Sequence, residues 1–446
     1  MYMVERAQNG FTLVEVAISV FIMSLMVLSV GGLFVSNLNT VTLGKSRAIG
    51  LGLANQQMEY LRDLPYNSLA TQHGTIYPPG NIPDTQTQYS DGYKFTVATQ
   101  IVYVHDPYDT NGVYPFDYKE AEIKVSMANT GQTVAELAST IAPKATQTPS
   151  NSGILSISVI NASGQPVSGA TVTITNPNPS PAVNITTTTN NQGIVVIPDL
   201  PPYSNNSYQV TATSPGYSTD GTIAPPGGGQ TAVEPNPNIL DQQITSITLA
   251  IDQLSTLSVH VQDTSGNLIS NLSVTTTGDK KTKLNPTVYK YSTATSTDSS
   301  GNISLANMEW DSYSFAVPAG HYIVSVQPYE PVALSPNATQ SVTLVVSTSA
   351  SWPIVASVSP SSAQTGTSSA SIAITGSNLP SSATMQLQMS GQTSISGTGC
   401  TSSGSNPNQV LTCSLNLTGA ATGNWDIVVT NGTGTVDQAG GFSVTP

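Results

Sequence analysis

The sequence predicts an α+β multidomain protein: a long N-terminal helix spans a membrane and packs on a small β-sheet, and three mainly antiparallel β-sandwich domains follow. Three observations predict this architecture. Residues 11–35 are almost all apolar or small, and ~20 such residues cross a bilayer as a helix. The chain holds 36 Gly and 30 Pro, which favours many short strands. An internal repeat begins at residue 153.

The first predicted element is one helix from about Thr12 to Leu64. Beyond the apolar run, apolar residues recur at three- and four-residue steps, which gives the helix one apolar face. Pro65 then ends it, and Gly31-Gly32 is a point where we expect it to loosen. A secretory signal is the alternative for the apolar run, but the run is too long and no small-residue cleavage site follows it.

The next predicted element is a β head at residues 66–142. The segments at 93–104 and 118–128 alternate apolar and polar residues. This pattern is typical of strands that pack by one face against a helix. A linker at 143–152, with no apolar period, separates the head from the rest of the chain.

The two repeats occupy residues 153–252 and 253–350. Each copy contains a strand, a Ser-Gly turn, a second strand, a polar excursion, a glycine turn and further strands, in the same order. About 100 residues is the usual size of a small β-sandwich. The last block, 351–446, has a different pattern but is equally rich in predicted strands.

The composition limits the partners of this chain. Charged residues are only 8% of the 446, and the net charge of −13 reflects missing bases more than abundant acids. No Lys or Arg lies between Lys144 and Lys280, and none follows Lys290. Phosphate binding requires clustered cations, so we expect no nucleic-acid partner. The composition fits a protein that is exposed at the cell surface or secreted.

The two cysteines, Cys400 and Cys413, flank turn residues between strand-like runs. This arrangement brings them together and favours a disulfide, which is consistent with an oxidising exterior. Two unpaired thiols are the alternative. A zinc site needs more ligands than lie nearby.

Candidate catalytic groups are sparse, so we expect no enzyme activity and no cofactor. No metalloprotease, phosphate-loop or nucleophile-elbow motif occurs, and His260 lies in an alternating strand where a cross-strand role is expected. Trp310, Tyr313 and Tyr322 are aromatic candidates for a sugar-binding surface, but burial in a sandwich core is the favoured interpretation. The four histidines are widely separated: His73, His105, His260 and His321.

The one candidate metal site is the connector between the two head strands. Asp106, Asp109 and Asn111 precede a glycine there and offer oxygens of the kind that Ca²⁺ binds. Their spacing misses the EF-hand loop, and no bidentate glutamate follows. A plain turn is therefore favoured, and calcium is the alternative.

The stretch GFTLVE at the start of the hydrophobic helix closely resembles the type IV prepilin signature. The resemblance implies that a prepilin peptidase cleaves after Gly10 and methylates the new N-terminus at Phe11. It also implies that Glu15 neutralises the N-terminal amine of a neighbouring subunit. An acid in hydrocarbon is costly unless it is paired, and this partner would explain Glu15. An ordinary signal anchor with a chance glutamate is the alternative.

The same resemblance implies a location and partners. The chain would be a single-pass protein of the inner (cytoplasmic) membrane before assembly, and would then join other pilins through its N-terminal helix in an extracellular pilus. LANQQMEYLRDLPYNSL is similar to the helix end of type IV pilus modification proteins and minor pseudopilins. DYKEAEIKVSMANTGQTVAELASTIAP resembles their closing strands.

The repeats resemble carboxypeptidase regulatory-like and Cna-B-like domains, which are non-catalytic sandwiches. Some Cna-B relatives carry a Lys–Asn isopeptide bond. The first repeat has no lysine, and the lysines of the second lie in the polar excursion, so we expect no such bond in either. The terminal block resembles an IPT/TIG immunoglobulin-like domain through PIVASVSPSSAQTG, IAITGSNL and GNWDIVVTNGTGTVDQAGGFSV. The lysines in question are Lys280, Lys281, Lys283 and Lys290.

Together these features predict a minor type IV pilin-like subunit that displays immunoglobulin-like modules for adhesion, with a surface or glycan ligand as the expected partner. A type II secretion pseudopilin and a static membrane-anchored adhesin are the alternatives. The predicted divisions are a leader at 1–10, a helix at 11–65 with its membrane span at 11–35, a head at 66–142, a linker at 143–152, and sandwiches at 153–252, 253–350 and 351–446.

Overall fold

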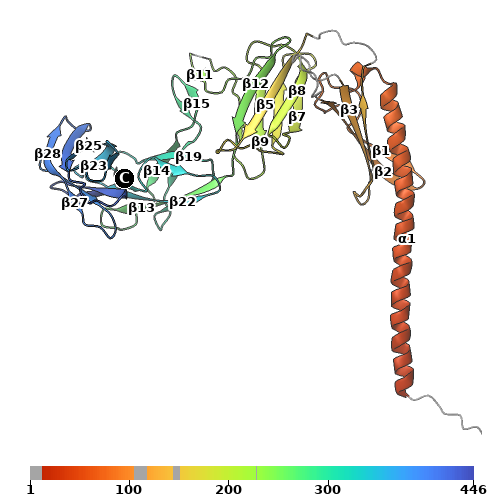
Figure 1. The fold of residues 1–446 in the computed structure, drawn as a ribbon, viewed down its shortest axis with the longest axis horizontal. Coiled ribbons are helices and arrows are strands. Elements are labelled where there is room, and N and C mark those ends of the chain that lie inside the picture. The colour runs from red at the N-terminus through yellow and green to blue at the C-terminus, as the bar shows by residue number, and fades with distance from the viewer. Residues whose placement is uncertain (1–12, 105–117, 144–150, 228) are drawn as a thin grey trace, which may run out of the picture.

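The computed structural model describes residues 13–104, 118–143, 151–227 and 229–446, apart from the side chains of 31–39 and Ala439. It shows an α+β multidomain chain: one long helix, a small sheet packed on its upper half, and a row of β-sandwiches (Figure 1). Helix α1 runs Leu13–Asp63, which agrees with the predicted bounds to within one residue. A short 3₁₀ turn, Tyr66–Ser68, follows Pro65.

The helix is continuous across Gly31-Gly32, where the sequence predicted loosening. Each glycine in a helix interior costs only about 1 kcal/mol relative to alanine. Hydrogen-bonded turns on both sides are enough to carry the helix through two such positions. The glycine pair therefore weakens the helix locally without ending it.

The head is a four-stranded antiparallel sheet in the order β1-β2-β3-β4. The apolar face of this sheet packs on the C-terminal half of α1. There, Met58 and Leu61 of the helix contact Phe95 and Ile123 of the sheet in one buried cluster. The two predicted strands are present, but the sheet has two more, so a two-stranded head was incomplete. The strands are β1 (Thr85–Ser90), β2 (Tyr93–Val104), β3 (Tyr118–Met127) and β4 (Thr133–Ile141).

The first repeat forms a sandwich of two sheets, β12-β5-β8 and β10-β9-β6-β7. Alternating apolar residues from both sheets fill its core, in which Tyr208 is fully buried. The first strand pairs in parallel with the last. The strands are β5 (Gly153–Ile160), β6 (Thr171–Asn176), β7 (Val183–Thr188), β8 (Ile194–Leu200), β9 (Gln209–Thr213), β10 (Asp220–Gly221) and β12 (Ile244–Ala250).

The second repeat follows the same plan with sheets β18-β13-β22-β20 and β17-β14-β19-β21. Its first and last strands, β13 and β22, again pair in parallel. The strands are β13 (Ser255–Asp263), β14 (Ser273–Gly278), β17 (Ser292–Ser296), β18 (Asn302–Met308), β19 (Asp311–Ala316), β20 (Tyr322–Gln327), β21 (Val332–Leu334) and β22 (Thr339–Ser347).

The terminal block is a third sandwich, with sheets β23-β25-β29-β28 and β24-β31-β30-β26-β27 around the buried Trp425. Its strands are β23 (Ile354–Ser359), β24 (Ser362–Gln364), β25 (Ala370–Ser377), β26 (Thr384–Gln388), β27 (Ile395–Ser396), β28 (Thr398–Ser403), β29 (Gln409–Leu415), β30 (Gly423–Thr430) and β31 (Thr435–Thr445).

The two repeats are joined by strand pairing as well as by the chain. Strand β11 (Thr231–Ala232) of the first pairs with β15 (Lys281–Leu284) of the second, and β16 (Val288–Tyr289) completes this small sheet. Lys290 Nζ lies 3.7 Å from the carboxylate of Asp220 across the junction and 2.8 Å from that of Glu309. The predicted lysine-rich excursion therefore lies at the contact between the repeats.

The second and third sandwiches share part of one core. Val324 of β20 is buried in the hydrophobic cluster of the third sandwich. The Ser325 hydroxyl donates to the backbone carbonyl of Asp437, and the Gln438 amide nitrogen donates to the Val324 carbonyl at 3.4 Å. The junction is thus packed and hydrogen-bonded across the two modules.

Candidate membrane anchor and assembly site

The part of α1 from Leu13 to Val30 exposes mainly apolar side chains on all sides. The window Leu13–Val30 has a mean hydropathy of 2.4, and none of it is buried inside the chain. The exposed side chains include Phe21 at 65% and Leu28 at 72% of their free area. Covering one such side chain is worth about 1.5–3 kcal/mol. This length of helix is suited to lipid or to neighbouring apolar helices rather than to water.

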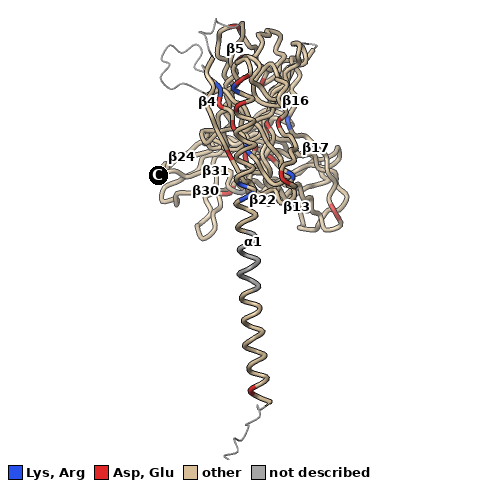
Figure 2. Tube along the Cα trace, turned by 90° about the vertical axis from the view of Figure 1, so that its right-hand side faces the viewer, with Lys and Arg blue, Asp and Glu red and all other residues tan. Residues whose placement is uncertain are grey.

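Glu15 is the one acidic residue in this apolar stretch. It lies in the first turn of α1, where the positive end of the helix dipole favours a carboxylate. Its backbone carbonyl accepts a hydrogen bond from the Ser19 hydroxyl at 2.7 Å. The next charged residue in the sequence is Lys45. Figure 2 shows one acidic position, in red, near the start of the helix. Glu15 therefore lies at the N-terminal end of the apolar helix, and its pairing with the amine of a neighbouring subunit stays a prediction.

Some predicted site residues cannot be placed. Gly10 and Phe11, the predicted cleavage and methylation site, lie outside the described residues. Asp106, Asp109 and Asn111, the calcium candidates, lie outside them too. Within the described parts of the chain, no three His, Cys, Asp or Glu side chains are grouped so that they could hold a metal ion.

The polar half of α1 is fixed to the head by side-chain contacts. The Gln86 amide nitrogen of β1 donates to the side-chain oxygen of Gln57 at 2.7 Å. The Arg62 guanidinium donates to Glu59 at 2.7 Å and to the Ser139 hydroxyl of β4 at 2.9 Å. These bonds hold the last turns of the helix on the sheet. They therefore fix the orientation of the head relative to the helix.

A buried lysine ties the helix end to the sheet. Lys119 of β3 is 2% exposed, and its Nζ donates to the backbone carbonyls of Tyr66 at 3.1 Å and Leu69 at 2.9 Å. The ammonium also lies 4.7 Å from the ring centre of Tyr66 and 5.0 Å from that of Tyr103, within the range of cation–π attraction. Burial lowers the pKa of Lys119 to about 8.

The buried lysine sits beside the contact between head and first sandwich. The Tyr103 hydroxyl donates to the carboxylate of Asp199 in the first sandwich, which also accepts from the Ser152 hydroxyl at 3.1 Å. Burial and the neighbouring carboxylate raise the pKa of Tyr103. The Tyr77 hydroxyl donates to the Pro181 carbonyl at 2.7 Å, and its ring packs against the first sandwich's core. The head is therefore joined to the stalk by specific contacts.

The direction of the stalk follows from these contacts. The row of sandwiches leaves the top of the head sideways, away from the axis of α1, while the apolar half of the helix extends below (Figures 1 and 2). We use stalk for residues 153–446.

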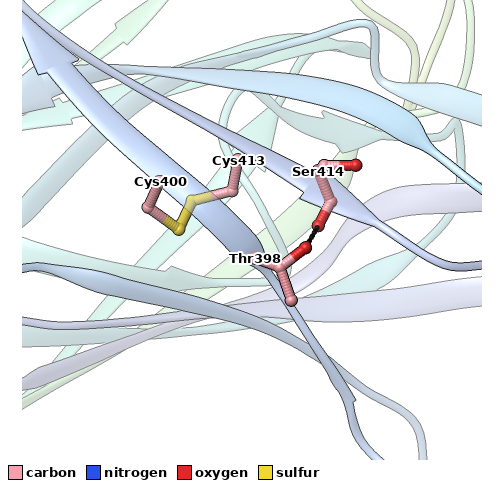
Figure 3. The surroundings of a disulfide bond; sticks show 4 residues. All are labelled: Thr398, Cys400, Cys413 and Ser414. Carbon is pink, nitrogen blue, oxygen red and sulfur yellow. Dashed lines mark hydrogen bonds between the residues drawn. A yellow bond between two sulfur atoms is a disulfide. The ribbon is translucent and has the colours of Figure 1, made fainter.

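The structure joins Cys400 of β28 to Cys413 of β29 in a disulfide, as the sequence predicted (Figure 3). Cys413 is buried in the third sandwich's core. Beside the disulfide, the Thr398 hydroxyl donates to the backbone carbonyl of Ser414 at 3.2 Å. The disulfide thus links two neighbouring strands, β28 and β29, at one edge of the terminal module.

The remaining candidates take structural positions. Tyr313 is 1% exposed in the second sandwich's core, as the favoured interpretation predicted. Trp310 lies beneath Lys280, whose Nζ is 3.2 Å from the centre of the indole ring. His260 pairs across strands with Asn302, with 2.7 Å between Nδ1 and Oδ1.

Two family models match the chain. Residues 6–31 match the prokaryotic N-terminal methylation motif, and residues 154–236 match the carboxypeptidase regulatory-like domain. These matches confirm the prepilin-type N-terminus and the nature of the first repeat. No match covers the terminal block, so its IPT/TIG resemblance stays a prediction. No curated protein is similar enough in sequence to be matched to this chain.

Several solved structures share low similarity with the chain. The Bacillus anthracis TIE protein is 11% identical to this chain. The match covers 80% of this chain and 71% of that protein, with a TM-score of 0.19. The shaft pilin spaA from Lactobacillus rhamnosus GG is 12% identical over 44% of this chain and 98% of the pilin, with a TM-score of 0.17. The Streptococcal ancillary pilin is 10% identical over 58% and 80%, with a TM-score of 0.22. At these values the similarity carries no argument about function.

The methylation motif and the apolar helix occupy the same N-terminal segment. The motif implies processing by a prepilin peptidase and assembly with other pilins. The helix provides the anchor in the membrane before assembly. The chain thus combines a prepilin-type N-terminus with a helix that is long and apolar enough to cross a membrane.

Proposed function

We propose that this chain is a minor, low-copy type IV pilin that works by assembly and display rather than by catalysis. Cleavage after Gly10 and methylation of Phe11 would release a subunit whose α1 joins the helical core of a filament. Glu15 would then pair with the N-terminal amine of a neighbour. The methylation motif at residues 6–31, which contains the membrane-capable window Leu13–Val30, is the observation that carries this proposal.

The stalk supports the low copy number. A helical filament repeats one contact between subunits, so the bulk of each subunit has to clear its neighbours. The stalk leaves the head sideways (Figure 1), which keeps the helical core free to pack. Neighbouring stalks would crowd one another if every subunit carried one. A position at the tip, or scattered along the shaft, avoids this crowding.

Adhesion is the proposed use of the far module. Serial sandwiches place residues 351–446 at the end of the stalk, away from the anchor. A surface ligand, with a glycan as the expected class, would bind there without a cofactor. A secretion pseudopilin or a static anchored adhesin are the alternatives that the experiments below separate.

Substitution of Gly10 is expected to block processing. The peptidase has to fit the backbone just before Phe11 into its site, and Gly10→Val adds a branched side chain at the bond to be cut. We expect the variant to remain in the membrane with Met1 present, as read by mass spectrometry of its N-terminal peptide. Gly44→Val is the matched control, since an added Cβ there meets nothing within 4 Å. Extracellular protein that retains Met1 would contradict processing and favour the static adhesin.

Stoichiometry is expected to show a minor subunit. In sheared, purified filaments, quantitative mass spectrometry should find this chain well below the most abundant pilin. An antibody to residues 351–446 should label filament tips or isolated points along the shaft. A strain without the major pilin is the control, since the processed chain should then stay with the membrane. Abundance equal to the major pilin would overturn the minor assignment, and absence from filaments alongside lost protein secretion would favour the pseudopilin.

A further inference from the structure

The first and last strands of each repeat run side by side in the same direction. In the first repeat, Ile154–Ile160 of β5 pairs in parallel with Ile244–Ala250 of β12 without a break in register. In the second, Thr256–Asp263 of β13 pairs in parallel with Thr339–Val346 of β22. Each first strand is also an interior strand, because β8 flanks β5 and β18 flanks β13 on the other side.

This pairing determines how the repeats respond to tension. The chain enters each repeat at the start of its first strand and leaves at the end of its last. In a parallel pair these two points lie at opposite ends, so a pull along the stalk slides one strand past the other. The evenly spaced hydrogen bonds of a parallel pair are then loaded together. If both strands were pulled from the same end, the bonds would break one after another.

We propose that the two repeats, residues 153–252 and 253–350, are load-bearing elements that themselves stay folded under tension along the chain. This goes beyond display, which requires only that the last module is exposed. The strength is a property of the fold and does not depend on the proposed pilin function. A surface-bound ligand would supply the load.

In the third sandwich, the first and last strands do not form a long parallel pair. Its parallel pairing is limited to Ser362–Gln364 of β24 with Ser443–Thr445 of β31. Its first strand, β23, lies in the other sheet and pairs antiparallel with β25. The disulfide joins Cys400 to Cys413 and does not cross-link the terminal strands. The proposal therefore places the mechanically weaker module at the outer end.

The repeats are also coupled at their junction. The β11–β15 pairing and the hydrogen bond from Lys290 Nζ to the Thr219 carbonyl, at 2.9 Å, join the first repeat to the second. Force that passes along the chain therefore meets a packed junction rather than a free hinge.

Optical tweezers on the full chain in detergent test the proposal by changing only the direction of pull. One variant carries handles on Gln253→Cys and Thr348→Cys, at opposite ends of the β13–β22 pair. The matched variant carries them on Gln253→Cys and Thr339→Cys, at the same end. All three side chains are exposed, and the native cysteines are held in the disulfide. Equal thermal unfolding of the two variants is the control for unchanged stability.

We expect the opposite-end pair to unfold at a force at least about threefold higher than the same-end pair at one pulling rate, because forced unfolding follows the barrier that the pull meets. Both events should release roughly 30 nm of chain. Similar forces in the two geometries would overturn the proposal, while filament incorporation would be unaffected and would still test the pilin function separately.

An end-to-end pull on the same chain gives a second check. The third sandwich should yield at the lowest force of the three, and its step should lengthen after reduction because the disulfide no longer holds back the segment between Cys400 and Cys413. A third sandwich that outlasts both repeats would contradict the proposed role of the parallel pairs.

Discussion

Glu15→Gln is expected to reduce incorporation of the chain into filaments at least about tenfold. Glutamine keeps the size and hydrogen-bonding capacity of the side chain but removes its charge. The proposed partner, the N-terminal amine of a neighbouring subunit, would then be left without its counter-ion. Breaking a desolvated pair costs about 3–5 kcal/mol, and each ~1.4 kcal/mol is a tenfold change in an equilibrium. The measurement is the ratio of filament to membrane protein by quantitative immunoblot.

Glu59→Gln is the matched control for this experiment. Glu59 is on the same helix, but it lies beyond the apolar window Leu13–Val30, is exposed, and pairs with Arg62 one turn away. Exposed ion pairs contribute little, so we expect normal incorporation. The β-modules of both variants should melt as in the parent chain, because α1 packs in the hydrophobic cluster of the head and not in theirs. Normal incorporation of Glu15→Gln would rule out the proposed pairing.

Lys119→Ala is expected to destabilise the head by about 3 kcal/mol. The substitution leaves the buried Leu69 carbonyl without its Lys119 donor, which costs about 1–3 kcal/mol. The Tyr66 carbonyl loses one donor but still accepts from the Leu69 N–H. It also opens a cavity where the four-carbon stem was packed. Hydrogen exchange of β2 and β3 peptides, measured by mass spectrometry, reports the opening free energy of the head apart from the sandwiches. Lys124→Ala, an exposed lysine on the same strand, is the control and should change it little.

The pH dependence separates the buried charge from packing alone. The pKa of Lys119 is lowered from 10.5 to about 8 in the folded head. Between these values the unfolded chain binds more protons than the folded one, so head stability should rise with pH through this window. Lys119→Ala should lack this rise and Lys124→Ala should keep it. A parent chain and a Lys119→Ala variant with the same slope would show that Lys119 is not desolvated.

The N-terminal helix could be predicted from the sequence almost to the residue. An unbroken apolar run, three- and four-residue spacing and a terminating proline all depend on neighbours within a few turns. Strand β1 was missed because TQTQYS carries no apolar alternation. The signal was the turn that follows it, since Asp91-Gly92 has positive φ at both residues. An Asp-Gly pair between two runs is a strong hairpin signal.

The burial of Lys119 could be predicted from the sequence, but its partners could not. It lies in phase with Ala121, Ile123 and Val125, so its burial follows from the alternation of the strand. Its hydrogen-bond partners come from the 3₁₀ turn after the helix, the ring of Tyr103 comes from β2, and Asp199 comes from another module. No local pattern links such distant residues. The parallel pairing of first and last strands is unpredictable for the same reason, because periodicity determines which face is buried and not which strand is the neighbour.

The bare lower half of α1 determines how reversible assembly can be. Lipid tails and apolar side chains are about equally good solvents for this surface, so moving the helix from bilayer to filament core brings no hydrophobic gain. Close packing and the Glu15 pair would have to supply the difference. A subunit balanced in this way can leave the membrane and return to it with little change in free energy. The same helix would therefore allow the bilayer to act as a reservoir of subunits from which filaments grow and into which they dissolve.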